Sequence, residues 1–435
     1  MDPGAPLPYL ACVLDFTDLP YQWFEPRPNR LARWLLRCHN RRTHLPGTLQ
    51  ITRVQIQGHG GLGDYRRAGD RLVLLPNHPT HADAAILLEA TRQAGLSTQV
   101  MAAYDVFLRS RCDAWVMQRL GAFSVDRDSS DPRAMKTALS VIERGRHALT
   151  VFPEGNVYLE NDRVTPFNDG AAFLALRGAK AAAAQNQRVW IVPVSIKATH
   201  REDVRSQITA RLTELARALD TSIDENMTPV EVLRKLGGAA LRRNLKHRGL
   251  DIPETDKLGD FIEHAGGAVL QGLETKLGIT AKPGDELMDR IRKARRIIHE
   301  VRTDPERVAD HAAASTWADE AMFALRIASY SGRYAADHPS VDRIAETAEK
   351  LAEDVHRKMM PPTGTRSVTV RFGKPLDLTV YLDNGKPRRG AVSEVSAAAE
   401  AAVQDGLDQI NAANTLAGAA LWDSPIGEII PAPGV

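Results

Sequence analysis

The feature that most constrains the fold is a regular alternation of short apolar runs with helical patterns across residues 48–200. Residues 72–75 form a continuous apolar run, and Val54 and Ile56 alternate with polar neighbours, as strands do. Helical patterns lie between such runs, at residues 134–144 and 171–184. Strands that alternate with helices favour a sheet covered by helices. We therefore predict an α/β core, with a mixed sheet flanked by helices.

Strand patterns nearly vanish after residue 200, and helical patterns separated by proline-containing turns dominate until about residue 362. Residues 366–382 then return to a strand pattern. This order predicts a large all-helical insertion between two strands of one sheet. A last alanine-rich helix is expected to run to about Leu421. The predicted division is an arm at 1–47, the core at 48–200, the insertion at 201–365, a returning strand at 366–382, and a helix and tail at 383–435.

The strongest chemical signal is His78, which follows the apolar run and precedes Asp83 by five residues. Histidine titrates near neutral pH, and a carboxylate can hold its ring in one tautomer, so the pair suggests a base that removes a proton from a hydroxyl. Residues five apart do not share a helix face. Thr80 as N-cap would solve this, with His78 before the helix and Asp83 in its first turn. Two alternatives are a simple helix-start carboxylate and a metal cluster of His78, His81 and Asp83.

Three further segments end strands with polar or special residues. Residues 121–127 read as a short strand followed by Arg127, which could fork onto a phosphate or be a solvated surface arginine. Residues 148–152 run into Pro153, Glu154 and Gly155, a tight turn that puts Glu154 at the carboxyl end of a strand, where ligands bind in open α/β sheets. Pro193 interrupts the fourth apolar run and predicts a sheet edge or a bulge.

These four segments, in this order, resemble the glycerolipid acyltransferase family that includes 1-acylglycerol-3-phosphate acyltransferases. The matching blocks are His78 to Asp83, Gly121 with Phe123 and Arg127, Phe152-Pro153-Glu154-Gly155, and the Pro193 block. The segment 370–376 looks like the strand that follows the core in such enzymes. The resemblance implies a glycerol-3-phosphate acyltransferase-like fold for residues 48–200 and 366–380.

The resemblance also implies a role for each matching residue. His78 would activate the hydroxyl of an acceptor, and Asp83 would orient and charge-balance it. Arg127 would hold the acceptor's phosphate, while Glu154 and Gly155 would shape the acceptor pocket. The chain departs from many members in having Asn156 after the glycine. It also lacks a lysine in the segment 166–170, which weakens the case for a phosphate-bearing acceptor.

Composition limits the partners and the compartment that we expect for this chain. The net charge of +2 gives no global argument for nucleic acid as a partner. The three cysteines, Cys12, Cys38 and Cys112, are odd in number and widely spaced, which predicts free thiols in a reducing compartment. Residues 1–8 do not resemble a signal peptide, and no run of 18 or more apolar residues predicts a membrane span. We therefore expect a cytoplasmic protein with no metal and no cofactor beyond an acyl thioester co-substrate.

A protein that acts on lysolipids without a membrane span should lie on the membrane surface. The arm offers a helix for this, at residues 29–42, with Leu31, Trp34, Leu35 and Cys38 on one side and five arginines for charge. Basic helices with Trp and Leu on one face bind anionic interfaces. The alternative is an amphipathic helix that packs on its own domain. We expect peripheral membrane association.

The resemblance, together with these patterns, implies an O-acyltransferase that moves a fatty acyl chain from acyl-CoA or acyl-carrier protein to the hydroxyl of a lysophospholipid, 1-acylglycerol-3-phosphate or a related acceptor. One alternative is a thioesterase or ester hydrolase that uses water activated by His78, although the chain lacks a Gly-x-Ser-x-Gly nucleophile turn. Another is a non-catalytic scaffold at the membrane surface.

Overall fold

The structure is a computed structural model that describes residues 21–58, 60–127, 131–253, 255, 257–282, 284–285 and 287–428. The first part of the predicted arm, with Cys12, and the end of the predicted tail lie outside the described residues. The chain forms two compact units. One comprises Tyr21–Glu202 and Gly364–Ala419, and the other comprises Asp203–Thr363 and residues 420–428. Cys38 and Cys112 are free.

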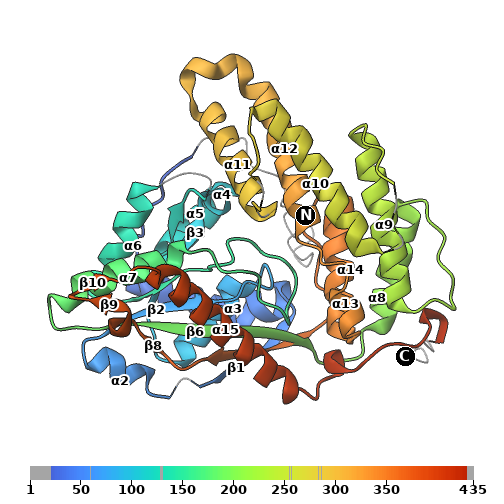
Figure 1. The fold of residues 1–435 in the computed structure, drawn as a ribbon. Coiled ribbons are helices and arrows are strands. Elements are labelled where there is room, and N and C mark those ends of the chain that lie inside the picture. Colours follow the sequence, from blue (N-terminus) through green and yellow to red (C-terminus); the bar gives the residue numbers. More distant parts are fainter. Residues whose placement is uncertain are drawn as a thin grey trace. The chain divides into compact units, whose positions relative to one another are not determined.

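The first unit is built on a mixed, mostly parallel sheet, which confirms the predicted fold class (Figure 1). Its strand order is β1-β7-β6-β2-β5-β3-β4, and β8 pairs with β6. All pairs along this order are parallel except β6 with β7, and β8 is also antiparallel to β6. The strands are β1 Ile51–Gln57, β2 Arg71–Pro76, β3 Thr98–Ala103, β4 Phe123–Val125, β5 Ala148–Thr150, β6 Val189–His200, β7 Arg366–Phe372 and β8 Leu376–Asp377.

Helices cover both faces of this sheet. Every residue of β2 is buried, as expected of a strand with both faces covered. Val73 and Leu75 join the apolar core formed with α6, α7 and α15, while α3 packs over β1 and β7. The helices of this unit are α1 Arg30–His39, η1 Asn40–Thr48, α2 Leu62–Arg67, α3 Asp83–Gln93, α4 Tyr104–Leu108, α5 Arg111–Leu120, α6 Pro132–Arg144, α7 Gly170–Ala183, η3 Leu378–Tyr381, α15 Ala391–Ala412 and η4 Ala417–Ala419. A small hairpin pairs β9 Leu382–Asp383 with β10 Lys386–Pro387.

The second unit is helical, as predicted for the insertion. One apolar cluster joins α8, α9 and α14, and another joins the end of α9 to α10, α11 and α12. Thr228 caps α9 with a reciprocal bond to Glu231, and Pro229 occupies the first helical position. The helices are α8 Arg205–Ala218, α9 Pro229–His247, α10 Leu258–Leu277, α11 Leu287–Thr303, η2 Pro305–Asp310, α12 His311–Ala328, α13 Tyr334–Asp337, α14 Val341–His356 and η5 Ile426–Glu428. Among the helices of the described residues, none combines the length and hydropathy needed to cross a membrane.

The prediction that Pro193 marks an edge or bulge is wrong. Pro193 lies inside β6, an interior strand, and pairs with Leu75 of β2. The Pro193 carbonyl accepts the Gly373 N–H at 2.8 Å, so the proline nitrogen faces the same side of the strand. On that side the partner of β6 changes at this point from β7, where Val194 pairs with Phe372, to β8, where Ile191 pairs with Leu376. The missing N–H therefore falls in a gap between two ladders, where no partner strand requires it.

The last helix also ends earlier than predicted. α15 stops at Ala412 rather than near Leu421. The alanine-rich pattern continues past this point and offers no strong stop signal, but the chain turns into the short helix η4 instead. Periodicity alone therefore did not place the end of this helix.

Gly58 and Gly95 provide a stability test of the β1–β7 pairing. Both have a left-handed backbone, with φ of +66° and +67°. A Cβ on Gly58 would lie 2.2 Å from the Phe372 carbonyl oxygen of β7, whereas one on Gly95 would meet nothing within 4 Å. Gly95→Ala should therefore lower the free energy of unfolding by about 1–2 kcal/mol, the cost of the backbone conformation alone. Gly58→Ala should cost about 1–3 kcal/mol more, because β1 and β7 must move apart.

Denaturant unfolding of the two variants measures this difference. Equal losses of stability in the two variants would show that the approach of Gly58 to β7 is not tight.

Candidate active site

His78 lies just beyond the end of β2, and α3 begins at Asp83. The chain turns between them, so that the Asp83 Oδ2 lies 2.8 Å from His78 Nδ1. Asp83 is completely buried, while the His78 side chain keeps 21% of its surface exposed. This bond fixes the ring orientation and leaves Nε2 as the ring atom with which a substrate can exchange a proton. The predicted pair is thus assembled at the carboxyl end of a buried strand.

The position of the helix cap differs from the prediction. The N-cap of α3 is Ala82, with no side-chain cap bond, rather than Thr80. Thr80 still serves the pair, because its N–H and its hydroxyl donate to the two oxygens of Asp83 at 2.8 and 2.7 Å. The Thr80 hydroxyl also accepts the Ala82 N–H at 3.2 Å. Asp83 is therefore oriented by Thr80 as well as by His78, and the amino end of α3 favours its negative charge.

Asn77, which the sequence analysis did not select, anchors His78 to the sheet. The pairing of β2 with β6 ends at Pro76 and Val194, although β6 continues to His200. Beyond that point the Asn77 side chain replaces the strand as the hydrogen-bond partner of β6. It donates to the Ile196 carbonyl at 3.0 Å and accepts the Ile196 N–H at 2.7 Å. The residue next to His78 is thus tied to the central strand by two buried hydrogen bonds. A single asparagine after a strand gives no sequence signal of this contact.

Glu154 contacts the histidine loop directly. Its Oε1 accepts the backbone N–H of His78 at 2.7 Å. Its Oε2 accepts the N–H of Thr165 at 3.2 Å and the Thr165 hydroxyl. Phe152, two residues earlier, stacks on the His78 ring with centroids 4.2 Å apart. Glu154 therefore holds the backbone of His78, and Phe152 packs against its imidazole ring.

The protonation of Glu154 gives a pH prediction. Burial raises the pKa of Glu154 from its ordinary value of 4.5 to about 8, and the carboxylates of Asp83 and Glu160 add to the rise, while the His78 and Thr165 N–H groups oppose it. The folded state then holds its proton more tightly than the unfolded state. The free energy of unfolding of the wild type should therefore fall, relative to Glu154→Gln, as pH rises from about 4.5 to about 8. The total change should be on the order of a few kcal/mol.

Thermal or denaturant unfolding across that pH range measures this effect. Glu202→Gln, at an exposed glutamate of the same unit, is the matched control and should follow the wild type. Parallel curves for the wild type and Glu154→Gln would show that the donors around Glu154 keep it ionised.

Arg127 and Gly155 meet on the other side of this turn. Arg127 Nη1 donates to the Gly155 carbonyl and to Asn156 Oδ1, both at 2.9 Å. Arg127 Nη2 lies 3.6 Å from Asp105. Gly155 has φ of +76°, and a Cβ there would lie 2.9 Å from the Asn168 amide, so the turn requires glycine. Asn156, the departure from the family pattern, thus helps to hold the arginine.

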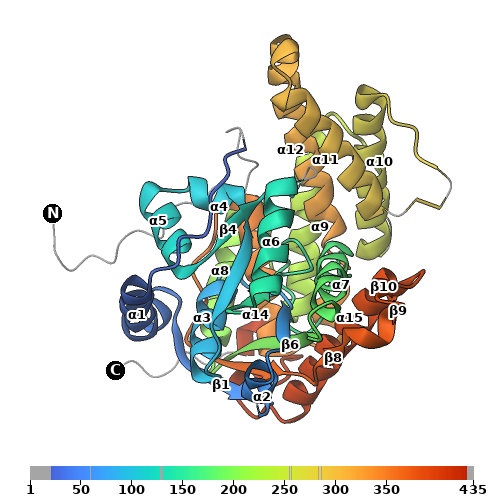
Figure 2. The same ribbon diagram turned by 90° about the vertical axis from the view of Figure 1, so that its left-hand side faces the viewer.

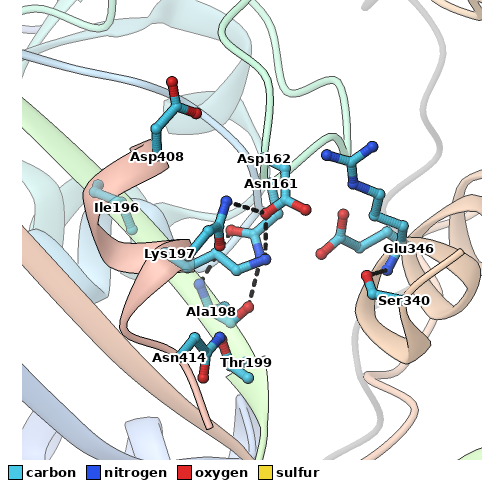
Figure 3. A network of polar contacts seen from close by, with 12 residues as sticks. Asn161, Asp162, Ile196, Lys197, Ala198, Thr199, Ser340, Glu346, Asp408 and Asn414 are labelled. Atoms are coloured by element: carbon cyan, nitrogen blue, oxygen red, sulfur yellow. Dashed lines mark hydrogen bonds and ion pairs between the residues drawn. The ribbon is translucent and has the colours of Figure 1, made fainter. Parts of the chain in front are cut away.

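The loop after the turn is held by β6 and α15, far away in sequence. Figure 3 shows Asn161 pairing with the backbone of Ala198, and Asp162 bonded to the buried ammonium of Lys197. Asn411 of α15 also donates to Asp162, at 3.1 Å. Three more hydrogen bonds join α15 to this loop. The Ser396 hydroxyl donates to Asp169, while the side chains of Glu400 and Gln404 accept the backbone N–H groups of Phe167 and Val164. The last helix, to which the sequence analysis gave no role in the site, therefore positions the loop that carries Thr165.

The structure brings together all five predicted site residues. His78, Asp83 and Glu154 are linked by hydrogen bonds, and Arg127 is bonded to Gly155. In the part of the chain that the structure describes, no group of three or more His, Cys, Asp or Glu residues is arranged to hold a metal ion.

The site thus consists of a histidine–carboxylate pair at the carboxyl end of β2, within a mixed sheet covered by helices. Residues 59–197 match the family model described as Acyltransferase. The matched segment runs from the end of β1 into β6 and contains His78, Asp83, Arg127, Glu154 and Gly155. The match covers less than half of the chain, agrees with its resemblance to glycerolipid acyltransferases, and supports acyltransferase activity. No curated protein matches the chain.

Proposed function

We propose that this protein is an O-acyltransferase that moves a fatty acyl chain from acyl-CoA or acyl-carrier protein to the hydroxyl of a lysophospholipid. The observation that carries the proposal is the 2.8 Å contact between His78 Nδ1 and the fully buried Asp83 carboxylate. A histidine held in this way can present its second ring nitrogen, as a base, to an acceptor hydroxyl. The acyltransferase-family match supports the same reaction class.

In the proposed reaction, His78 Nε2 takes the proton of the acceptor hydroxyl as the oxygen attacks the thioester carbonyl. The new C–O bond forms and the C–S bond breaks. The proton then passes from the imidazolium to the leaving thiolate, which restores the neutral histidine. Asp83 stabilises the imidazolium in between and remains a carboxylate. No acyl-enzyme intermediate is required.

The roles proposed for the remaining site residues follow from their contacts. Glu154 holds the His78 backbone and shapes the acceptor pocket together with Gly155. The Arg127 side chain is one-third exposed and uses Nη1 for its bonds to the turn. Its remaining N–H groups would bind the acceptor's phosphate, as in 1-acylglycerol-3-phosphate or a related lysolipid. Metal ions and cofactors have no part in this mechanism.

Thiol release from the donor tests the proposal. The protein would be offered acyl-CoA or acyl-carrier protein with a panel of lysolipid acceptors, and free thiol and acylated product would be measured together. We expect thiol release that depends on the acceptor and matches product formation. Equal release without an acceptor would identify a thioesterase instead. A folded protein that releases no thiol from either donor would support the scaffold interpretation.

A further inference from the structure

Helix α1 packs on its own unit through its arginines rather than through its apolar side. Arg33 donates to Ser97 Oγ at 2.5 Å and to the Leu120 carbonyl at 2.6 Å. It also reaches the Thr98 carbonyl at 3.2 Å, and Arg37 reaches the Leu96 carbonyl at 3.5 Å. These contacts hold the helix against α5 (Figure 2) and against the start of β3. They also fix which side of the helix faces outward.

The outward side is apolar. Leu31, Trp34 and Leu35, at helical spacing of three and four residues, are 66, 61 and 52% exposed. On α5, which packs against α1, Trp115 is also half exposed. Single exposed apolar residues are common in folded proteins, but several large ones on one helix face mark an interaction site. Contact of this apolar face with water is unfavourable, so the free energy falls when a partner covers the face.

The charge around this face indicates the partner. Residues 29–42 contain five arginines and no Asp or Glu. Arg33 and Arg37 are turned inward, while Arg30, Arg41 and Arg42 remain exposed. Exposed Leu and Trp side chains flanked by arginines match the interface of an anionic bilayer, where tryptophan occupies the headgroup level and arginine pairs with phosphate. A protein partner would require no such uniform positive charge.

We infer that the apolar face of α1 docks on the surface of an anionic lipid bilayer, with Leu31, Trp34 and Leu35 inserted at the headgroup level. The inference depends on the surface of α1 and not on the proposed reaction. It is therefore testable without substrate, and a failed activity assay would not affect it.

Flotation with lipid vesicles tests the inference. The full-length protein would be mixed with phosphatidylcholine vesicles, with and without phosphatidylglycerol. We expect it to float with the anionic vesicles. Replacing Leu31, Trp34 and Leu35 together by serine should weaken the apparent affinity by about tenfold or more, because their apolar area no longer enters the bilayer. Replacing Arg30, Arg41 and Arg42 by glutamate should remove the preference for phosphatidylglycerol.

Val380→Ser is the matched control, since Val380 is 68% exposed in the same unit but lies on η3. It should float like the wild type. Thermal unfolding checks that each variant is folded, which is expected because all the altered side chains are exposed. Unchanged flotation of the triple serine variant, or no flotation of the wild type, would overturn the inference. So would a lipid-free dimer that the triple serine variant converts to a monomer, since the occupant of the face would then be a second copy.

Discussion

Replacing His78 by alanine is expected to lower kcat for acyl transfer by about 10²–10⁴-fold, the usual contribution of a general base. The acceptor hydroxyl would then have no group to receive its proton as it attacks. The KM for the acceptor should change much less, because the phosphate contact proposed for Arg127 remains. Steady-state kinetics with the acceptor that the thiol-release assay identifies measures both quantities. Free imidazole should restore part of the lost rate, because it can enter the space that the side chain leaves.

His81→Ala is the matched control, a histidine three residues further along the same turn and without a proposed role in the reaction. Its kcat should stay within about threefold of the wild type, far from the loss expected for a general base. A His78→Ala variant that is folded and retains most of its kcat would refute the base assignment. A large loss in His81→Ala alone would instead assign the base to His81.

Asp83→Asn should lower kcat by about 10²-fold or more with little change in KM. The amide has nearly the shape of the carboxylate and can still accept the Thr80 N–H. In that orientation the amide oxygen also faces His78 Nδ1, because Oδ2 of Asp83 makes both contacts. In the other orientation the NH₂ group faces His78 Nδ1 at the cost of the Thr80 N–H bond, and the ring then carries its proton on Nε2, where a base is needed. The lost charge also leaves the imidazolium without its counter-ion. The same kinetic measurements, with ring nitrogen NMR of His78 to identify the tautomer, test both effects.

The matched control for this substitution is Glu89→Gln. Glu89 is a buried carboxylate on the same helix, but its partners are Arg92 and Gln93 rather than the histidine. Its loss should lower stability and leave kcat close to the wild-type value. If Asp83→Asn and Glu89→Gln reduce kcat equally, Asp83 acts through the stability of α3 and not through His78.

Much of the fold was predictable because local periodicity survives in the folded chain. The buried run of β2, the short strand β4 and the helices α6 and α7 all follow patterns that a single segment displays. Pro193 predicted an irregular position, but the strands that leave the gap beside it were not predictable. The gap depends on how β7 and β8, almost 180 residues later, share one side of β6. Such a contact has no local signature.

The candidate site divides in the same way. His78 and Asp83 were selected from their spacing, and the structure brings them into contact. Their supports were not selected, because Asn77, Thr165 and the polar side of α15 act through contacts with the backbone of distant segments. Thr80 was selected as the N-cap of the helix, but that position is taken by Ala82. Thr80 donates to the carboxylate of Asp83 instead, and the helix begins at Asp83 rather than directly after Thr80.

The position of β1 at the edge of the sheet has a consequence for the synthesis of this protein. The neighbour of β1 in the strand order is β7, and roughly 300 residues of chain separate the two. At about 5–20 residues per second on the ribosome, β1 waits for tens of seconds before its partner strand exists. The helical segment between β6 and β7 is made during this delay. The pairing of β1 with β7 can therefore form only late in synthesis, and until then the hydrogen-bonding groups of β1 lack their partner strand.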